Sequence, residues 1–176
     1  HMLASIKRAT ASACLLLAGW ALIGCATAPA DPGVWVSSAT GTVTTYSRRA
    51  SGSLGSGEMQ VVWTIGPERT WEGRPVVPHI SPQAGTSLYD AATRAYVAQL
   101  NAAGQPVLSF EPPIGLPSPL VVGSAWSSKH TLTNHVRQTK MTYEVAFKVA
   151  ALEDVSVPAG RFQAFRAVAT DIFGAR

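Results

Sequence analysis

Apolar and polar residues alternate along several stretches of the chain, as they do in strands that bury one face of a sheet. The alternation is clearest over residues 140–149, where apolar side chains share one predicted face and mostly polar side chains share the other. Residues 59–65 repeat the pattern, and residues 42–49 are expected to pair with them through a Gly-rich hairpin loop at 52–57. In the strands at 59–65 and 140–149, the residues predicted to face inward are Met59, Val61, Trp63, Ile65, Met141, Tyr143, Val145, Phe147 and Val149.

From Val34 onward, turn residues punctuate the chain at intervals of roughly 8 to 14 residues, which is typical of a meander of antiparallel strands. The segments between the turns are rich in Val, Thr, Tyr, Phe and Trp. We therefore predict a mainly β fold, in which an antiparallel meander forms a curved sheet, either a half-barrel or an open barrel. The pattern stops abruptly at Arg176, so the sheet is expected to be open at that edge or to be truncated by a strand.

Two later stretches depart from simple alternation. Residues 87–104 could form a helix capped by Ser87 and Gly104, but turn-like sequences at 90–94 and 101–104 favour a strand over 95–101 between two hairpin turns. Residues 106–119 contain five prolines. Because proline cannot donate a hydrogen bond to a neighbouring strand, this stretch is expected to be a loop at an edge of the sheet or over one end of it.

The N-terminal residues have the layout of a bacterial export signal. Lys7 and Arg8 precede a dense apolar run over 13–23. As a helix this run would reach about 16 Å, too short to cross a bilayer core of about 30 Å. The run closes on Leu22-Ile23-Gly24-Cys25, which resembles the lipobox of bacterial lipoproteins.

This resemblance implies that residues 1–24 are a signal peptide, with 1–2 a cloning scar, and that Cys25 becomes the acylated first residue. Residues 25–33 would then tether a single β-rich periplasmic domain over 34–176. Ala26 after the cysteine points to a periplasm-facing lipoprotein of the outer membrane in a Gram-negative bacterium, so the membrane is an expected partner. The alternative is an ordinary secreted protein that is cut after the A-x-A sequence at 26–28.

Composition narrows the class of protein further. Charged residues make up 14% of the chain and apolar residues 47%, which excludes disorder for most of it. The net charge of +4 falls to +2 without Lys7 and Arg8. The remaining basic residues are not clustered, so nucleic acid is not an expected partner.

Two later motifs resemble small bacterial envelope domains of unknown function, the β-rich DUF3108-like proteins. The first is the P-L-x-V-G-x-x-W sequence at 119–126, and the second is the V-x-V-P-A-G-x-F sequence at 155–162, which continues to Phe165. The second motif suits a hairpin, because Pro158 presets a turn and Gly160 allows a positive φ. The resemblance implies a β-rich fold and says nothing about chemistry.

A search for catalytic and metal-binding patterns finds none of the common motifs. His130 and His135 are five positions apart on a predicted strand, so they should point to opposite faces and not share a metal. The acidic residues are scattered. The sequence therefore predicts no catalytic residues, no metal site and no cofactor, with a hydrolase only as the weakest alternative.

The aromatic residues suggest what the domain does. They could line a concave cavity for an apolar ligand, or they could simply fill the core. The candidate cavity residues are Trp63, Trp71, Trp126, Tyr143, Phe147 and Phe165, with Phe162 beside them. Two functions remain open: a module that binds an apolar or lipid-like ligand, and an interaction protein that contacts an envelope protein through its sheet edge or its Pro-rich loop.

Overall fold

The computed structural model describes residues 3–4, 38–50 and 57–172. Every regular element in these ranges is a strand. The strands are β1 (Leu3–Ala4), β2 (Val43–Ala50), β3 (Gly57–Ile65), β4 (Arg69–Trp71), β5 (Arg74–Ser81), β6 (Gly85–Asp90), β7 (Tyr96–Leu100), β8 (Pro106–Ile114), β9 (Ala125–Asn134), β10 (Thr139–Val157) and β11 (Gly160–Ile172). Within the same ranges no helix is long and apolar enough to cross a membrane.

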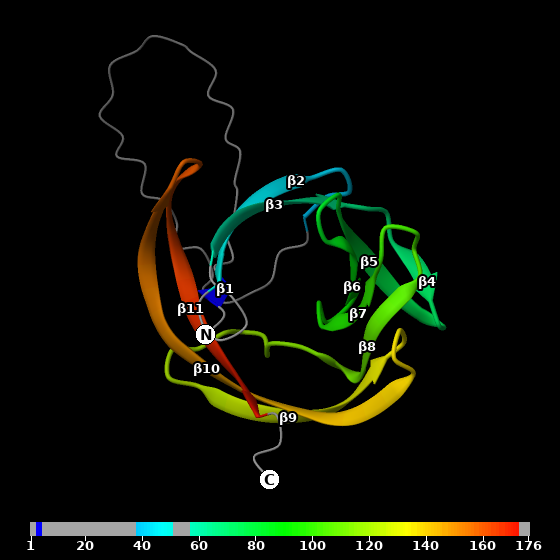
Figure 1. The fold of residues 1–176 in the computed structure, drawn as a ribbon. Helices are drawn as coiled ribbons and strands as arrows, with labels where there is room; N and C mark the ends of the chain where they lie inside the picture. Colours follow the sequence, from blue (N-terminus) through cyan, green and yellow to red (C-terminus); the bar gives the residue numbers. More distant parts are fainter. Residues whose placement is uncertain (1–2, 5–37, 51–56, 173–176) are drawn as a thin grey trace, which may run out of the picture.

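The strands form one antiparallel sheet in the order β1-β11-β10-β9-β8-β7-β6-β5-β3-β2, with β4 paired to β5 beside that path. From β2 to β11, neighbours in the sheet are therefore neighbours along the chain, apart from the short β4. Figure 1 shows the sheet curling around, with β5–β8 as one wall and β10–β11 as the opposite wall. The two ends of the sheet, β2 and β1, do not pair with each other. The predicted antiparallel meander is confirmed, and it is an open one.

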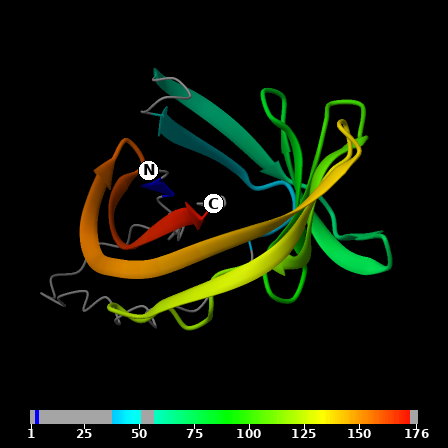
Figure 2. The ribbon, with the colours of Figure 1, turned by 60° about the horizontal axis from the view of Figure 1, so that its bottom comes forward.

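The strands predicted from alternation are present. Residues 59–65 lie in β3 and pair with β2, and residues 140–149 lie in β10, which extends further to Val157. Figure 2 shows β9 and β10 as long strands that run the length of the molecule. The predicted hairpin loop at 52–57 lies almost wholly outside the described residues, but its two flanking strands are joined in register from Val43–Thr64 to Ala50–Gly57.

Residues 87–104 form strands and turns, as preferred from the sequence, and the helical alternative is wrong. The reason is local. The Asp90 carboxylate accepts hydrogen bonds from the backbone N–H groups of Ala92 and Thr93, which stabilises a turn where a helix would have to continue. The Asn101 side chain does the same for the next turn, accepting from Ala103 N and Gln105 N.

The loop predicted over 106–119 is wrong for its first nine residues, because residues 106–114 form β8 between β7 and β9. The prolines are accommodated by irregular pairing. Ladder pairing with β9 ends at Glu111. On the other side, Ala98 pairs with Ser109 while Tyr96 pairs with Ile114, so Pro112 and Pro113 lie in a bulge where no ladder donor is required.

The best-buried cluster lies on one face of β5–β7. Its members are Val76, Leu88, Val97, Ala98 and Leu100, each no more than 3% exposed, and Trp71 of β4 packs against them. Burying such side chains contributes about 1.5–3 kcal/mol each. This cluster holds β5, β6 and β7 in place, and the other face of these strands carries a different set of side chains.

Candidate functional site

The strand register places the two predicted inward faces on the same side of the sheet. Ile65 of β3 pairs with His79 of β5, so Trp63 shares that face because side chains alternate along a strand. The face continues through the pairs Tyr89–Tyr96, Phe110–Leu132 and Leu132–Met141. We call it the aromatic face. Its rings are Tyr46, Trp63, His79, Tyr89, Tyr96, Phe110, Trp126, His130, Tyr143, Phe147 and Phe165.

Most of these rings touch one another in a row across the strands. The ring centroids of His79 and Tyr89 are 4.4 Å apart, and those of Tyr89 and Tyr96 are 5.5 Å apart. The row continues from Tyr96 to Phe110 at 5.6 Å and from Phe110 to Tyr143 at 5.5 Å. Such spacings are favourable for tilted aromatic pairs. A continuous apolar band therefore crosses β5, β6, β7, β8 and β10.

A second group of rings lies further along β9 and β10. Trp126 and Phe147 are directly opposite in the register and stack with centroids 5.2 Å apart. Phe165 of β11 shares this face, because Ala167, two residues on, pairs with Val149. All three side chains are half-buried. Each of these rings is thus partly covered by protein and partly accessible.

The six predicted cavity residues therefore divide into two groups. Trp63, Trp126, Tyr143, Phe147 and Phe165 share the aromatic face. Trp71 lies elsewhere, because it pairs with Arg74 and packs against the buried cluster on the opposite face. Phe162, named beside the six, also lies on the opposite face, since it precedes Phe165 by three positions on β11 and pairs with Val155.

The sequence reading missed His79, Tyr89, Tyr96 and Phe110. Tyr89 and Tyr96 fall in the segment whose helical alternative stayed open, and Phe110 falls in the stretch assigned to a loop. The alternation of Phe110 with Leu108 was the available signal. It was outweighed by the prolines that follow.

The polar side chains within the aromatic face are bonded to one another. Ser87 Oγ and the Tyr96 hydroxyl both donate to Gln99 Oε1, at 2.7 and 3.2 Å. Gln99 Nε2 donates to the carbonyl oxygens of Ala84 and Leu100, at 2.7 and 3.0 Å. Gln99 therefore satisfies both its donors and its acceptor internally.

Burial disfavours the charged forms of His79, Tyr89 and Tyr96 on this face. Desolvation, with repulsion from Arg94, lowers the pKa of His79 from 6.5 to about 4. Desolvation, with a contribution from Tyr89, raises the pKa of Tyr96 to about 12. Burial likewise raises the pKa of Tyr89. These three rings therefore add no charge to the apolar band near neutral pH.

Two serine–histidine pairs flank the sheet. On the aromatic face, Ser128 Oγ lies 2.7 Å from His130 Nε2, and His130 Nδ1 lies 2.6 Å from the Pro112 carbonyl oxygen. On the opposite face, Ser109 Oγ lies 2.8 Å from His135 Nε2. His130 is on β9, whereas His135 lies in the turn after it, so the two imidazoles do not face each other.

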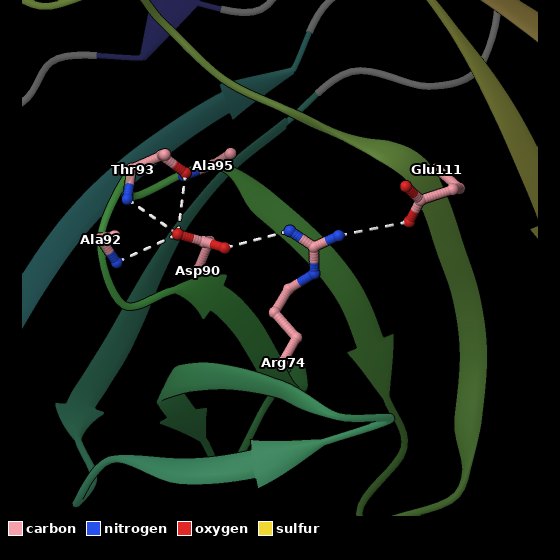
Figure 3. A network of polar contacts seen from close by, with 6 residues as sticks. All are labelled: Arg74, Asp90, Ala92, Thr93, Ala95 and Glu111. Carbon is pink, nitrogen blue, oxygen red and sulfur yellow. Dashed lines mark hydrogen bonds and ion pairs between the residues drawn. The ribbon is translucent and has the colours of Figure 1, made fainter.

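A charged network lies on the opposite face (Figure 3). Arg74 bridges two carboxylates, with Nη1 3.1 Å from Asp90 Oδ2 and Nη2 3.5 Å from Glu111 Oε2. Burial raises the pKa of Asp90, but hydrogen bonds from Thr93, Arg74 and Ala92 outweigh it and hold that pKa below its usual range. A nearby depression of about 350 Å³ is lined by Glu68, Pro75, Asp90, Ala91 and Ala92. The network ties β5, β6 and β8 together.

Among residues 3–4, 38–50 and 57–172, no three His, Cys, Asp or Glu side chains are grouped so that they could hold a metal ion. Cys25 and nearly all of the predicted signal peptide and tether lie outside the described residues. No protein-family model, no curated protein and no solved structure matches the chain. The aromatic face is thus the strongest candidate site, on geometric grounds alone.

Proposed function

We propose that this protein is a lipid-anchored protein of the cell envelope whose aromatic face binds an apolar or lipid-like ligand. The observation that carries the proposal is the continuous band of rings on one side of an open, curved sheet, in which Phe110 is buried and the other rings are half-buried. The buried cluster on the other side already supplies a packed core at β5–β7. The aromatic face also holds buried side chains, Val61, Ile65, Val145 and Val149, and the half-buried rings beside them keep part of their surface accessible.

Several rings of the aromatic face are incompletely buried. Trp126, Phe147 and Tyr143 are each only half-buried, although a large aromatic side chain buries about 150–250 Å² when it is fully covered. A ligand with an acyl chain or a ring would cover the remaining surface and gain about 25 cal/mol for each Å² of apolar area removed from water. The neutral forms of His79 and Tyr96 favour an uncharged portion of the ligand at this band.

The anchor is a separate part of the proposal. The sequence Leu22-Ile23-Gly24-Cys25 and the resemblance of the two later motifs to DUF3108-like envelope proteins support a lipoprotein of the outer membrane. Removal of residues 1–24 would also remove β1, which pairs with Val168 and Ala167. The outer edge of β11 would then be free of this partner.

Two mass measurements test these parts independently. The intact mass of the protein extracted from membranes should correspond to a chain beginning at an acylated Cys25, and Cys25→Ser should leave the precursor unprocessed. A wild-type mass that retains residues 1–24 would contradict the anchor. Native mass spectrometry after delipidation and incubation with a fatty acid or phospholipid should show a bound adduct. A bare protein mass with every lipid offered would contradict the ligand proposal.

The edge of β2 favours a second candidate function, contact with another envelope protein. Within the described residues, β2 pairs only with β3, so its outer edge presents unpaired backbone groups that could add a strand from a partner. The Pro-rich stretch supports this role less than expected, because residues 106–114 lie inside the sheet. A photo-activated cross-linker at Ser47, which is exposed on β2, should capture a partner in cells, and its failure to do so would count against this role.

A further inference from the structure

The aromatic face contains a serine and a histidine in the arrangement of a catalytic nucleophile and its base. His130 Nδ1 lies 2.6 Å from the Pro112 carbonyl oxygen. A carbonyl oxygen can only accept, so Nδ1 carries the proton and donates it. In the neutral form of the ring, Nε2 is then the acceptor for the Ser128 hydroxyl, 2.7 Å away. A serine poised to give its proton to an imidazole, whose other nitrogen is held by a third group, is the geometry used in acyl transfer.

The fold holds this arrangement firmly. His130 is 4% exposed, so its ring has little freedom to rotate. The pairing of β8 with β9 ends at the Glu111–Thr131 pair, and β8 then turns at its bulge. This departure brings the carbonyl of Pro112 onto the imidazole. The same irregularity that accommodates the prolines therefore supplies the group that orients His130.

The serine lies where a bound acyl chain would be. Trp126, Ser128 and His130 alternate on β9 and share the aromatic face. Ser128 is half-buried, and its neighbour Trp126 stacks on Phe147. An acyl chain that covers these rings would place its carbonyl end beside Ser128 Oγ. This step rests on the proposed ligand binding.

A backbone donor for a developing oxyanion lies close to Ser128. Beyond His130 toward Ala125, the described part of the chain gives β9 a strand partner only on the β10 side. Successive N–H groups of a strand point to opposite edges. One of the two N–H groups of Ser128 and Lys129 is therefore directed to the open edge, where such donors stabilise tetrahedral intermediates.

We propose that Ser128 and His130 hydrolyse an ester of an acyl chain bound on the aromatic face. Ser128 Oγ attacks the ester carbonyl carbon while its proton passes to His130 Nε2. The tetrahedral intermediate collapses, the C–O bond to the alcohol breaks, and the proton passes from Nε2 to the leaving alcohol. A water molecule then attacks the acyl-serine, gives one proton to Nε2, and releases the carboxylic acid as Ser128 Oγ recovers that proton.

A fluorophosphonate probe tests the dyad directly, because an activated serine displaces fluoride from phosphorus and becomes covalently labelled. The full chain in detergent should be labelled at Ser128, as read by peptide mass spectrometry. Ser128→Ala should abolish labelling, and His130→Gln should slow it by about 100-fold or more, the effect of losing a general base. Ser109→Ala is the matched control, since Ser109 makes the same type of bond to His135 on the opposite face, and it should label as the wild type does.

The readout distinguishes this proposal from the ligand proposal. Lipid adducts in native mass spectrometry should persist in Ser128→Ala, because the rings are intact. Adducts without any labelling of wild-type Ser128 would overturn the dyad and leave ligand binding standing. The absence of adducts would overturn the ligand proposal instead. The labelled position is read in the wild-type protein, so the test holds even where a variant fails to fold.

Discussion

The indole of Trp126 lies almost parallel to the phenyl ring of Phe147, with an angle of 16° between the two planes. The two residues are directly opposite on β9 and β10. Cross-strand aromatic pairs contribute about 0.5–1.5 kcal/mol beyond the area that they bury. This pair therefore stabilises the pairing of β9 with β10 while leaving part of each ring accessible.

Trp126→Ala is expected to weaken the binding of a fluorescent fatty acid by about tenfold or more, because it removes both the stacked pair and a large apolar surface. A fluorescence titration measures the effect. Val136→Ala is the control, since Val136 is 71% exposed in the turn between β9 and β10 and should leave the affinity unchanged. Equal affinities for Trp126→Ala and wild type would place the ligand away from these rings.

The turn between β5 and β6 offers a sharp test of the packing. Gly85 has a φ of +74°, and a Cβ there would overlap the carbonyl oxygen of Leu100. Gly85→Ala should lower the free energy of unfolding by about 3 kcal/mol, from the left-handed backbone and the clash together. Gly104 has a similar φ of +78°, but a Cβ there would meet nothing within 4 Å. Gly104→Ala should therefore lower the free energy of unfolding by only about 1–2 kcal/mol. Urea denaturation that gives equal losses would show that β7 does not approach Gly85 so closely.

Asp90 should stabilise the fold through its charge. Its pKa is lower in the folded state, so the stabilisation is present above the unfolded-state pKa and is lost as the pH falls through the folded-state pKa. Asp90→Asn is expected to lower the free energy of unfolding at pH 7 by about 1–3 kcal/mol and to flatten its fall between about pH 5 and pH 2.

Glu111→Gln provides the comparison for Asp90, because the Glu111 side chain is 75% exposed and an exposed ion pair contributes less than about 1 kcal/mol. Urea denaturation across this pH range measures both variants. A larger loss for Glu111→Gln than for Asp90→Asn would reverse the assigned importance of the two carboxylates.

His79 should make the protein sensitive to mild acid. Its pKa falls from 6.5 to about 4 on folding, so the unfolded chain takes up a proton first. Protonation of His79 therefore leaves the free energy of unfolding unchanged above pH 6.5 and lowers it as the pH falls toward 4, by up to about 1.4 kcal/mol per pH unit. His79→Phe keeps a ring against Tyr89 and should remove this decline. Parallel stability curves for variant and wild type from pH 7 to 4.5 would contradict the assignment.

The sequence predicted the strands best where one face is buried and the other is exposed. The alternation over 59–65 and 140–149 follows from that asymmetry. The expectation of burial was wrong for Met59 and Met141, which lie on the inward face but are 47% and 51% exposed. It failed at 106–114, because prolines normally exclude an internal strand and the bulge that accommodates Pro112 and Pro113 is set by pairing with β7 and β9. This register depends on all three strands, so it cannot be inferred from the sequence of β8 alone.

The candidate site was predicted in part for the same reason. Alternation placed Trp63 and Tyr143 on inward faces, and the register confirms that both lie on one side of the sheet. It could not show that Trp71 belongs to the opposite face, because β4 is a three-residue strand and carries no periodicity. Nor could it bring Pro112 O to His130, since that contact depends on how β8 leaves β9.

The open meander affects how wide a ligand the curved sheet can enclose. In a closed barrel, the number of strands and their stagger fix the radius. Here β2 and β1 do not pair, so no such condition applies. The radius of curvature can change through small adjustments of twist between adjacent strands, without the loss of a ladder hydrogen bond. One sheet of this kind can therefore close around a single slender chain or relax around a bulkier one.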